Sequence, residues 1–305
     1  MTHGVGARNS RTWIWLGMAV VVAMVGFLLW RNVPAAQVER PSLKEKAAQS
    51  PASVDVQADE GFTSTSTGYG RPAEAARLKT FEDLKRRAKA GDPVAQRLLA
   101  DTYESCYIVN FNREHFLNFV DVTGGMMTDP AELQGLERAA RERVAQCDVV
   151  DGGAIVPLEL IRGWYAQAAE NGDLAARLTD NALNKKSVGA AESASLIEEV
   201  LGSNDPAAVF AMGSTLFRNF PAGFSGPAGE LVTGDQASEA WQVAACRMGY
   251  DCGPSSVLMG SMCLAMMGCA SDDYEGAVKR ILKSDLERRN LERRVTEILR
   301  LMEGR

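Results

Sequence analysis

Six cysteines are the residues best suited to chemistry in this chain of 305 residues. The last four form two pairs, each six positions apart, which suits local disulfides, and a helix ending near the second cysteine would reach back to the first. Neither zinc binding nor thiol redox catalysis is expected, because no C-x-x-C spacing occurs and no histidine lies near. Structural disulfides in an oxidising compartment are therefore predicted, and the alternative is buried thiols in a reducing cytosol. The six are Cys106, Cys147, Cys246, Cys252, Cys263 and Cys269.

Enzymatic signatures are mostly absent. The two histidines are His3 and His115, so a catalytic triad or a histidine-rich metal site beyond the N-terminal tail would depend on His115 alone. No P-loop, G-x-G-x-x-G, G-x-S-x-G, S-x-x-K or H-E-x-x-H motif occurs. Neighbouring acids such as Asp272 and Asp273 point apart on a helix, so they suit a helix cap better than a glycosidase pair. We therefore predict a protein that is not an enzyme, with no cofactor and no metal.

The charge balance argues against nucleic acid as a partner. The formal net charge is −6, and since Arg8 and Arg11 precede every acidic residue, the rest of the chain carries −8. Such a surface repels a phosphate backbone. The basic cluster 85–87 alternates with acids at helical spacing, which indicates a solvated helix face.

An uncharged apolar segment, residues 13–30, is the predicted transmembrane helix, preceded by a short cytoplasmic tail, residues 1–12. A helix of this length spans roughly 27 Å, close to the hydrocarbon core of a bilayer. Trp13 and Trp30 at its ends suit the membrane interface. The alternative is a cleaved signal peptide with a processing site near residues 33–35.

Residues 31–75 are predicted to be a flexible linker, because Pro, Ser, Thr and Ala dominate and few apolar residues are available for a core. Arg8 and Arg11 favour a cytoplasmic N-terminus, and the cysteines favour an oxidising compartment for the C-terminal domain. Together with a composition rich in Ala, Gly and Arg, this predicts a single-pass protein of the bacterial inner membrane with a periplasmic domain. The alternative is a domain facing the cytosol with reduced cysteines.

A corner motif that joins two helices recurs along the chain and helps to position the cysteines. Gly91 suits the left-handed conformation that ends a helix, Asp92 suits a cap on the next helix, and Pro93 fits that helix's first turn. Asparagine is the next best left-handed residue and replaces the glycine in one copy. The further copies are Asn204, Asp205 and Pro206, then Gly172 and Asp173, and finally Gly249.

Small residues beside these corners predict close helix packing. Ala168 and Ala176 lie one turn to either side of a corner, where two passing helices leave room for little beyond a methyl group. Trp164 is expected to fill the wider gap farther from that corner. The equivalent residues in all copies are Ala95, Ala169, Ala208, Trp241, Ala244 and Ala245.

The pattern W-Y-x-x-A-A-x-x-G-D-x-x-A in residues 164–176, with partial copies in 84–103 and 241–258, resembles the Sel-like repeats of the tetratricopeptide repeat superfamily. That family's repeat period of about 36 residues is interrupted here by inserts at 107–156 and 220–234. The resemblance implies an all-α, solenoid-like stack of antiparallel helical hairpins over residues 76–305 that acts as a scaffold for protein contacts. Some cysteine-rich members bridge the two helices of a hairpin, and the placement of Cys246 and Cys252 is similar.

Two further helices follow from local signals. One starts with Asp129 as cap and Glu132 completing a capping box, and it ends near Cys147. The other opens with Ser284 and Glu287, a second capping box. We interpret the latter as the closing helix of the stack, and the alternative is an exposed helix that binds a partner.

The sequence thus predicts a membrane-anchored periplasmic scaffold that binds another protein or an envelope component, without indicating which one. Its candidate contact surfaces are Phe116 and Phe119 in the first insert and Phe220 and Phe224 in the second. Both segments would alternatively cover gaps in the stack. The alternative function is an envelope hydrolase acting on peptidoglycan or a related substrate, which carboxylates converging in a pocket would favour.

Overall fold

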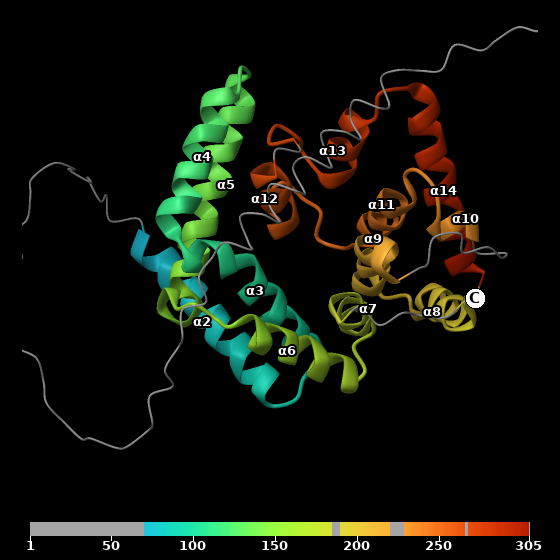
Figure 1. Ribbon diagram of the computed structural model, residues 1–305, viewed down its shortest axis with the longest axis horizontal. Coiled ribbons are helices and arrows are strands. Elements are labelled where there is room, and N and C mark those ends of the chain that lie inside the picture. The colour runs from blue at the N-terminus through green and yellow to red at the C-terminus, as the bar shows by residue number, and fades with distance from the viewer. Residues whose placement is uncertain (1–69, 185–189, 220–228, 266–267, 305) are drawn as a thin grey trace, which may run out of the picture. The chain divides into compact units, whose positions relative to one another are not determined.

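The computed structural model describes residues 70–184, 190–219, 229–265 and 268–304, and every regular element in these ranges is a helix (Figure 1). The all-α prediction is therefore confirmed for this part of the chain. The apolar segment 13–30, most of the linker and residues 220–228 lie outside it. Among the helices that are described, none combines the length and the apolar character needed to cross a bilayer.

The helices follow one another through short connections. In chain order they are α2 (Gly70–Lys89), α3 (Pro93–Phe111), α4 (Arg113–Met126), α5 (Pro130–Val149), the 3-10 helix η1 (Val150–Gly153), α6 (Leu158–Glu170), α7 (Leu174–Leu183), α8 (Ala190–Ser203), α9 (Pro206–Asn219), α10 (Gly229–Val232), α11 (Ala237–Arg247), α12 (Val257–Leu264), α13 (Tyr274–Ile281) and α14 (Asp285–Glu303).

Three of the predicted corners form as expected, joining α2 to α3, α6 to α7 and α8 to α9. Gly91 and Gly172 have positive φ angles of 90° and 98°, and Asn204 takes the same region at 50°. Each following aspartate caps the next helix. The cap bonds run from Ala95 N to Asp92 Oδ1 (3.0 Å), from Ala176 N to Asp173 Oδ1 (2.7 Å) and from Ala207 N to Asp205 Oδ1 (2.9 Å).

Successive hairpins contact one another through the predicted small residues. α3 packs on α6, α7 on α9, and α9 on α11. Ala95, Ala168, Ala176 and Ala208 are fully buried at these contacts, while Ala169 is half-buried. Trp164 packs against the N-terminal core but is only partly buried. Its neighbour Tyr165, 1% exposed, fills the space between α6 and α3, since the helix rotates that position inward.

The fourth corner departs from the expected hairpin. Trp241, Ala244 and Ala245 are completely buried, and Trp241 Nε1 donates to the Leu231 carbonyl at 2.8 Å. Gly249 has a φ of 103°, as the corner requires, yet the next helix begins only at Val257. The intervening turn is held instead by the Cys246–Cys252 disulfide.

All six cysteines are paired, and this confirms the prediction of structural disulfides. The bridges are Cys106–Cys147, Cys246–Cys252 and Cys263–Cys269, and the described chain contains no free cysteine. Three bridges in one domain indicate an oxidising location outside the cytoplasm.

The first predicted insert is itself helical. The end of α3, α4 and α5 occupy it, and α5 packs on α2, α3 and the distant α12 (Figure 1). Asp129 caps α5 by accepting from Ala131 N at 2.8 Å, as predicted. The predicted capping box is wrong, because Glu132 accepts from Cys269 N at 2.6 Å instead. Gly135 permits this approach, since a Cβ there would lie 2.7 Å from the Cys269 Cβ.

The last helix closes the stack, as predicted. α14 starts with the Ser284–Glu287 capping box and packs on α11. Its apolar stripe is buried against the stack, which is not the arrangement that a partner-binding helix would need, although Leu286 near its start is 60% exposed. The buried residues are Leu291, Val295, Ile298 and Met302.

Candidate functional site

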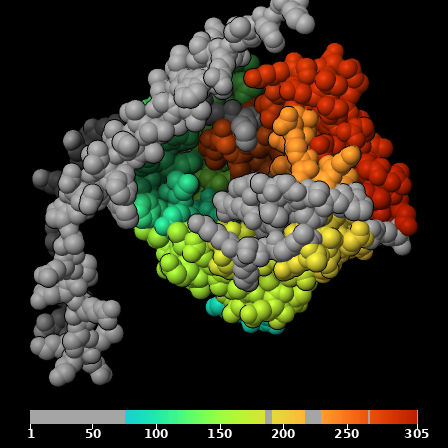
Figure 2. Space-filling view, turned by 45° about the vertical axis from the view of Figure 1, so that its right-hand side comes forward, coloured from blue at the N-terminus to red at the C-terminus, as the bar shows by residue number. Residues whose placement is uncertain are grey.

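The structure contains a groove of about 700 Å³, which we call the inner groove, and helices distant in sequence line it. α3, α6 and α7 contribute part of the lining, and α9, the turn at Tyr250 and α12 contribute the rest. The molecular surface is hollowed between the teal N-terminal region and the orange C-terminal region (Figure 2). Its charged and aromatic lining residues are Arg97, Asp101, Glu104, Tyr165, Phe210 and Tyr250.

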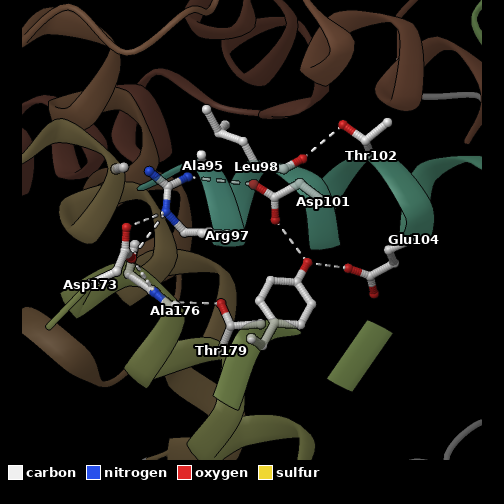
Figure 3. A network of polar contacts seen from close by, with 12 residues as sticks. Ala95, Arg97, Leu98, Asp101, Thr102, Glu104, Asp173, Ala176 and Thr179 are labelled. Carbon is white, nitrogen blue, oxygen red and sulfur yellow. Dashed lines mark hydrogen bonds and ion pairs between the residues drawn. The ribbon is translucent and has the colours of Figure 1, made fainter. Parts of the chain in front are cut away.

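A buried ion pair joins the two hairpins that border the groove. Arg97 on α3 donates from Nε to both carboxylate oxygens of Asp173, each at 3.0 Å (Figure 3). Only 10% of the Arg97 side chain and 2% of the Asp173 side chain are exposed. Burial lowers the pKa of Arg97, but the carboxylates of Asp173 and Asp101 raise it by more, so the guanidinium stays charged. The corner aspartate therefore caps its own helix and also fixes the neighbouring hairpin.

Two carboxyl groups meet at one hydroxyl beside this pair. Tyr165 lies between Asp101 and Glu104, and its hydroxyl donates to Asp101 Oδ1 at 2.8 Å and to Glu104 Oε2 at 2.7 Å. Asp101 also faces the Arg97 guanidinium, with Oδ2 at 3.4 Å from Nη1 (Figure 3). A phenol carries a single proton, which cannot serve both acceptors fully. The two carboxyl groups therefore share one donor, and that donor satisfies neither fully when both are ionised.

The electrostatic setting of Asp101 agrees with this proton count. Burial at the base of the groove raises the pKa of Asp101 to about 6, although Arg97 and the Tyr165 hydroxyl both act to lower it. The side chain is nevertheless 45% exposed, so solvent and ligands in the groove can reach it. Burial and the two nearby carboxylates raise the pKa of Tyr165 far above its usual range, so this hydroxyl remains a donor.

Aromatic side chains contribute a further part of the groove. Phe210 and Tyr250 stack with their ring centroids 4.4 Å apart and an interplanar angle of 8°. Burial raises the pKa of Tyr250, and the nearby carboxylate of Asp101 acts in the same direction. Among the described residues, none makes a hydrogen bond to the Tyr250 hydroxyl.

The predicted contact residues lie elsewhere. Phe116 is buried in the N-terminal core, 7% exposed, because α4 turns it toward α5, and it is not presented to a partner. Phe119 is 44% exposed on the same helix. Phe220 and Phe224 lie outside the described residues. Neither Phe116 nor Phe119 is among the described residues that line the inner groove.

The remaining polar residues singled out in the sequence take structural positions. His115 is exposed in the first turn of α4, where its backbone N–H donates to Asn112 Oδ1 at 2.9 Å. Asp273 caps α13 by accepting from Gly276 N at 2.7 Å, as predicted. Among the described residues no group of histidine, cysteine and acidic side chains is arranged to hold a metal ion.

Sequence reasoning missed the polar residues of the groove, although a signal was present. Arg97, Asp101 and Glu104 are spaced four and three residues apart, which places them on one face of α3. From the sequence alone, a charged helix face of this kind would be interpreted as exposed to solvent. Its contact with Tyr165 depends on how α6 packs against α3, which the local pattern does not encode.

Comparison with known proteins does not extend this description. No family model matches the chain, and neither the curated proteins nor the solved structures gave a match.

Proposed function

We propose that this protein is a membrane-tethered scaffold with degenerate Sel-like repeats, whose helical domain binds a partner protein at the bacterial cell envelope. The apolar segment 13–30 supports the tether, and the three disulfides support a periplasmic position for the domain. The capped corners and buried alanines support the repeat assignment. The helical insert α4–α5 accounts for the irregular repeat period.

The observation that carries the proposal is the composition of the inner groove. Two carboxyl groups, Asp101 and Glu104, are held in place by Tyr165, and the stacked aromatic pair of Phe210 and Tyr250 shares the same groove. Carboxylates accept charge-assisted hydrogen bonds from ammonium and guanidinium groups, and aromatic faces attract the same cations. The groove is therefore suited to a partner segment that inserts a lysine or arginine side chain.

An envelope hydrolase is the second candidate, because the two carboxyl groups converge and a pKa of about 6 at Asp101 suits a general acid. The Tyr165 hydroxyl, however, lies within 2.8 Å of one carboxyl group and 2.7 Å of the other. A glycosidase must admit the scissile bond between its two carboxyl groups. The filled space favours binding over hydrolysis. Digestion of purified peptidoglycan by the wild type, but not by Asp101→Asn, would reverse this preference.

Site-specific photocrosslinking in intact cells tests the binding proposal. Leu98 lines the inner groove and is 40% exposed, whereas Leu160 lies outside it on α6 and is 49% exposed. A photoreactive phenylalanine analogue at Leu98 should yield a discrete crosslinked protein, and the same group at Leu160 should not. Equal crosslinking from both positions would contradict a partner seated in the groove.

The location is tested separately by topology reporters at the C-terminus. An alkaline phosphatase fusion should be active and a green fluorescent protein fusion dark, because only the former matures in the periplasm. The opposite pattern would place the domain in the cytosol and remove the basis for an envelope role.

A further inference from the structure

A second cavity of about 540 Å³, which we call the side pocket, adjoins the inner groove and is bordered by α2, α5 and the start of α12. Leu84, Thr102, Gln146 and Val257 line both spaces. The side pocket differs from the groove in charge. Among its described lining residues, two are arginines and one, Glu142, is an acid.

Arg143 is the distinctive residue of the side pocket. Its Nη1 donates to the Ser105 carbonyl of α3 at 2.9 Å, and its Nη2 donates to the Ser261 Oγ of α12 at 2.8 Å. Both acceptors are neutral, and no described carboxylate forms an ion pair with Arg143. By contrast, the guanidinium of Arg97, which is more deeply buried than the half-buried Arg143, has two carboxylate partners. Burial lowers the pKa of Arg143, as expected for a cation without a counter-charge.

The hydrogen-bonding capacity of Arg143 is also incompletely used. A guanidinium has five N–H donors in a planar fork, and acceptors from the described residues bind two of its nitrogen atoms. Such a fork matches the paired oxygens of a carboxylate or phosphate. Arg77, exposed on α2, adds a second positive charge to the lining.

The first turn of α12 points to the same kind of ligand. Ser256 caps α12 by accepting from Met259 N at 3.1 Å, while the N–H groups of Val257 and Leu258 have no acceptor among the described residues. Ser255, Ser256 and Val257 line the side pocket, so this helix start borders it. Free N–H groups at a helix start favour an anion. The rest of the lining is largely apolar and includes Phe81, Leu84 and Val150.

We propose that the side pocket binds a small amphipathic anion, with its carboxylate or phosphate on Arg143 and its apolar chain against Phe81, Leu84 and Val150. The oxyanion would supply the counter-charge that Arg143 does not receive from the described residues. This site goes beyond the proposed scaffold function, because it does not depend on a protein partner in the inner groove.

The proposal is tested by isothermal titration calorimetry on the purified full-length protein. The probes are hexyl phosphate and hexanoate, with hexanol and hexylamine as uncharged and cationic controls of similar chain length. Saturable binding of one or both anions, without binding of the controls, is expected. Which anion binds more tightly distinguishes a phosphate ligand from a carboxylate ligand. Equal binding of hexanol or of hexylamine would overturn the proposal.

Matched variants locate the site. Arg143→Gln should weaken binding roughly tenfold or more, because it removes a charge-assisted contact. Arg141→Gln, an exposed neighbour on α5 paired with Glu137, should have no effect. Arg77→Gln leaves the core untouched and should weaken binding about threefold. Unchanged affinity in both Arg143→Gln and Arg77→Gln would refute the site. Phe210 lines the groove but not the side pocket, so Phe210→Ala should leave anion binding intact even if partner crosslinking is lost.

Discussion

Two corner aspartates make the same local contacts but differ in burial, and this difference supports a quantitative prediction. Asp92 caps α3 and pairs with Arg87, whose side chain is 46% exposed. Asp173 caps α7 and pairs with Arg97, whose side chain is 10% exposed. Asparagine retains an oxygen for the cap, so substituting each aspartate by asparagine removes the charge while leaving the cap in place.

The expected free energies of unfolding follow from that burial. Removing one partner of a buried ion pair costs roughly 3 to 5 kcal/mol, because the other charge stays desolvated. Asp101 remains near Arg97, so we expect a loss of about 3 kcal/mol for Asp173→Asn. An exposed pair contributes roughly 0 to 1 kcal/mol, which sets the expected loss for Asp92→Asn. For a domain of this size, the melting temperature should fall by about 6 to 12 °C for Asp173→Asn and by less than about 4 °C for Asp92→Asn.

Urea unfolding of the full-length protein, followed by circular dichroism under non-reducing conditions, measures both variants. Adding Arg97→Met to Asp173→Asn removes the buried guanidinium that has lost its main partner, and it should recover much of the lost stability. Equal losses for Asp92→Asn and Asp173→Asn would refute the reasoning. So would a double variant that is no more stable than Asp173→Asn alone.

Two further outcomes follow from the described contacts. A raised pKa at Asp101 means that the folded state binds this proton more tightly than the unfolded chain, so its stabilising contribution is lost as pH rises from about 4 to about 6. Asp101→Asn should therefore be more stable than the wild type by about 1 kcal/mol at pH 7.5, a value that allows for solvent screening of the half-exposed carboxylate. At pH 4 the two proteins should be equally stable, and thermal unfolding at both pH values measures the difference. Replacing the Cys106–Cys147 pair by alanines should cost about 4 kcal/mol, against about 2 for the Cys246–Cys252 pair, because their loops span 41 and 6 residues. Equal losses in urea unfolding would contradict this order.

Local features of the fold were predictable from the sequence. Left-handed Gly91, Gly172 and Asn204, and the aspartates that follow them, are determined by backbone sterics and by the unpaired N–H groups of a helix start. The Ser284–Glu287 capping box is equally local. Disulfide pairing was indicated because two of the three bridges close short segments.

Contacts between distant segments were not predictable in the same way. Glu132 was expected to complete a local cap, but it accepts from the Cys269 backbone, 137 positions away. Tyr165 is buried in place of Trp164 because the rotation of α6 is set by its contact with α3. The groove residues belong to the same class, since Arg97 and Asp173 are separated by 76 positions.

The central claim, that the inner groove recognises a basic segment of a partner, is tested most directly by the affinity of the crosslinked partner segment for two forms of the protein. The double variant Asp101→Asn, Glu104→Gln preserves the volume of both side chains and removes their charge. The wild type should bind the segment at least about tenfold more tightly than this variant, and the difference should shrink at high salt. Equal affinities at every salt concentration would contradict the claim.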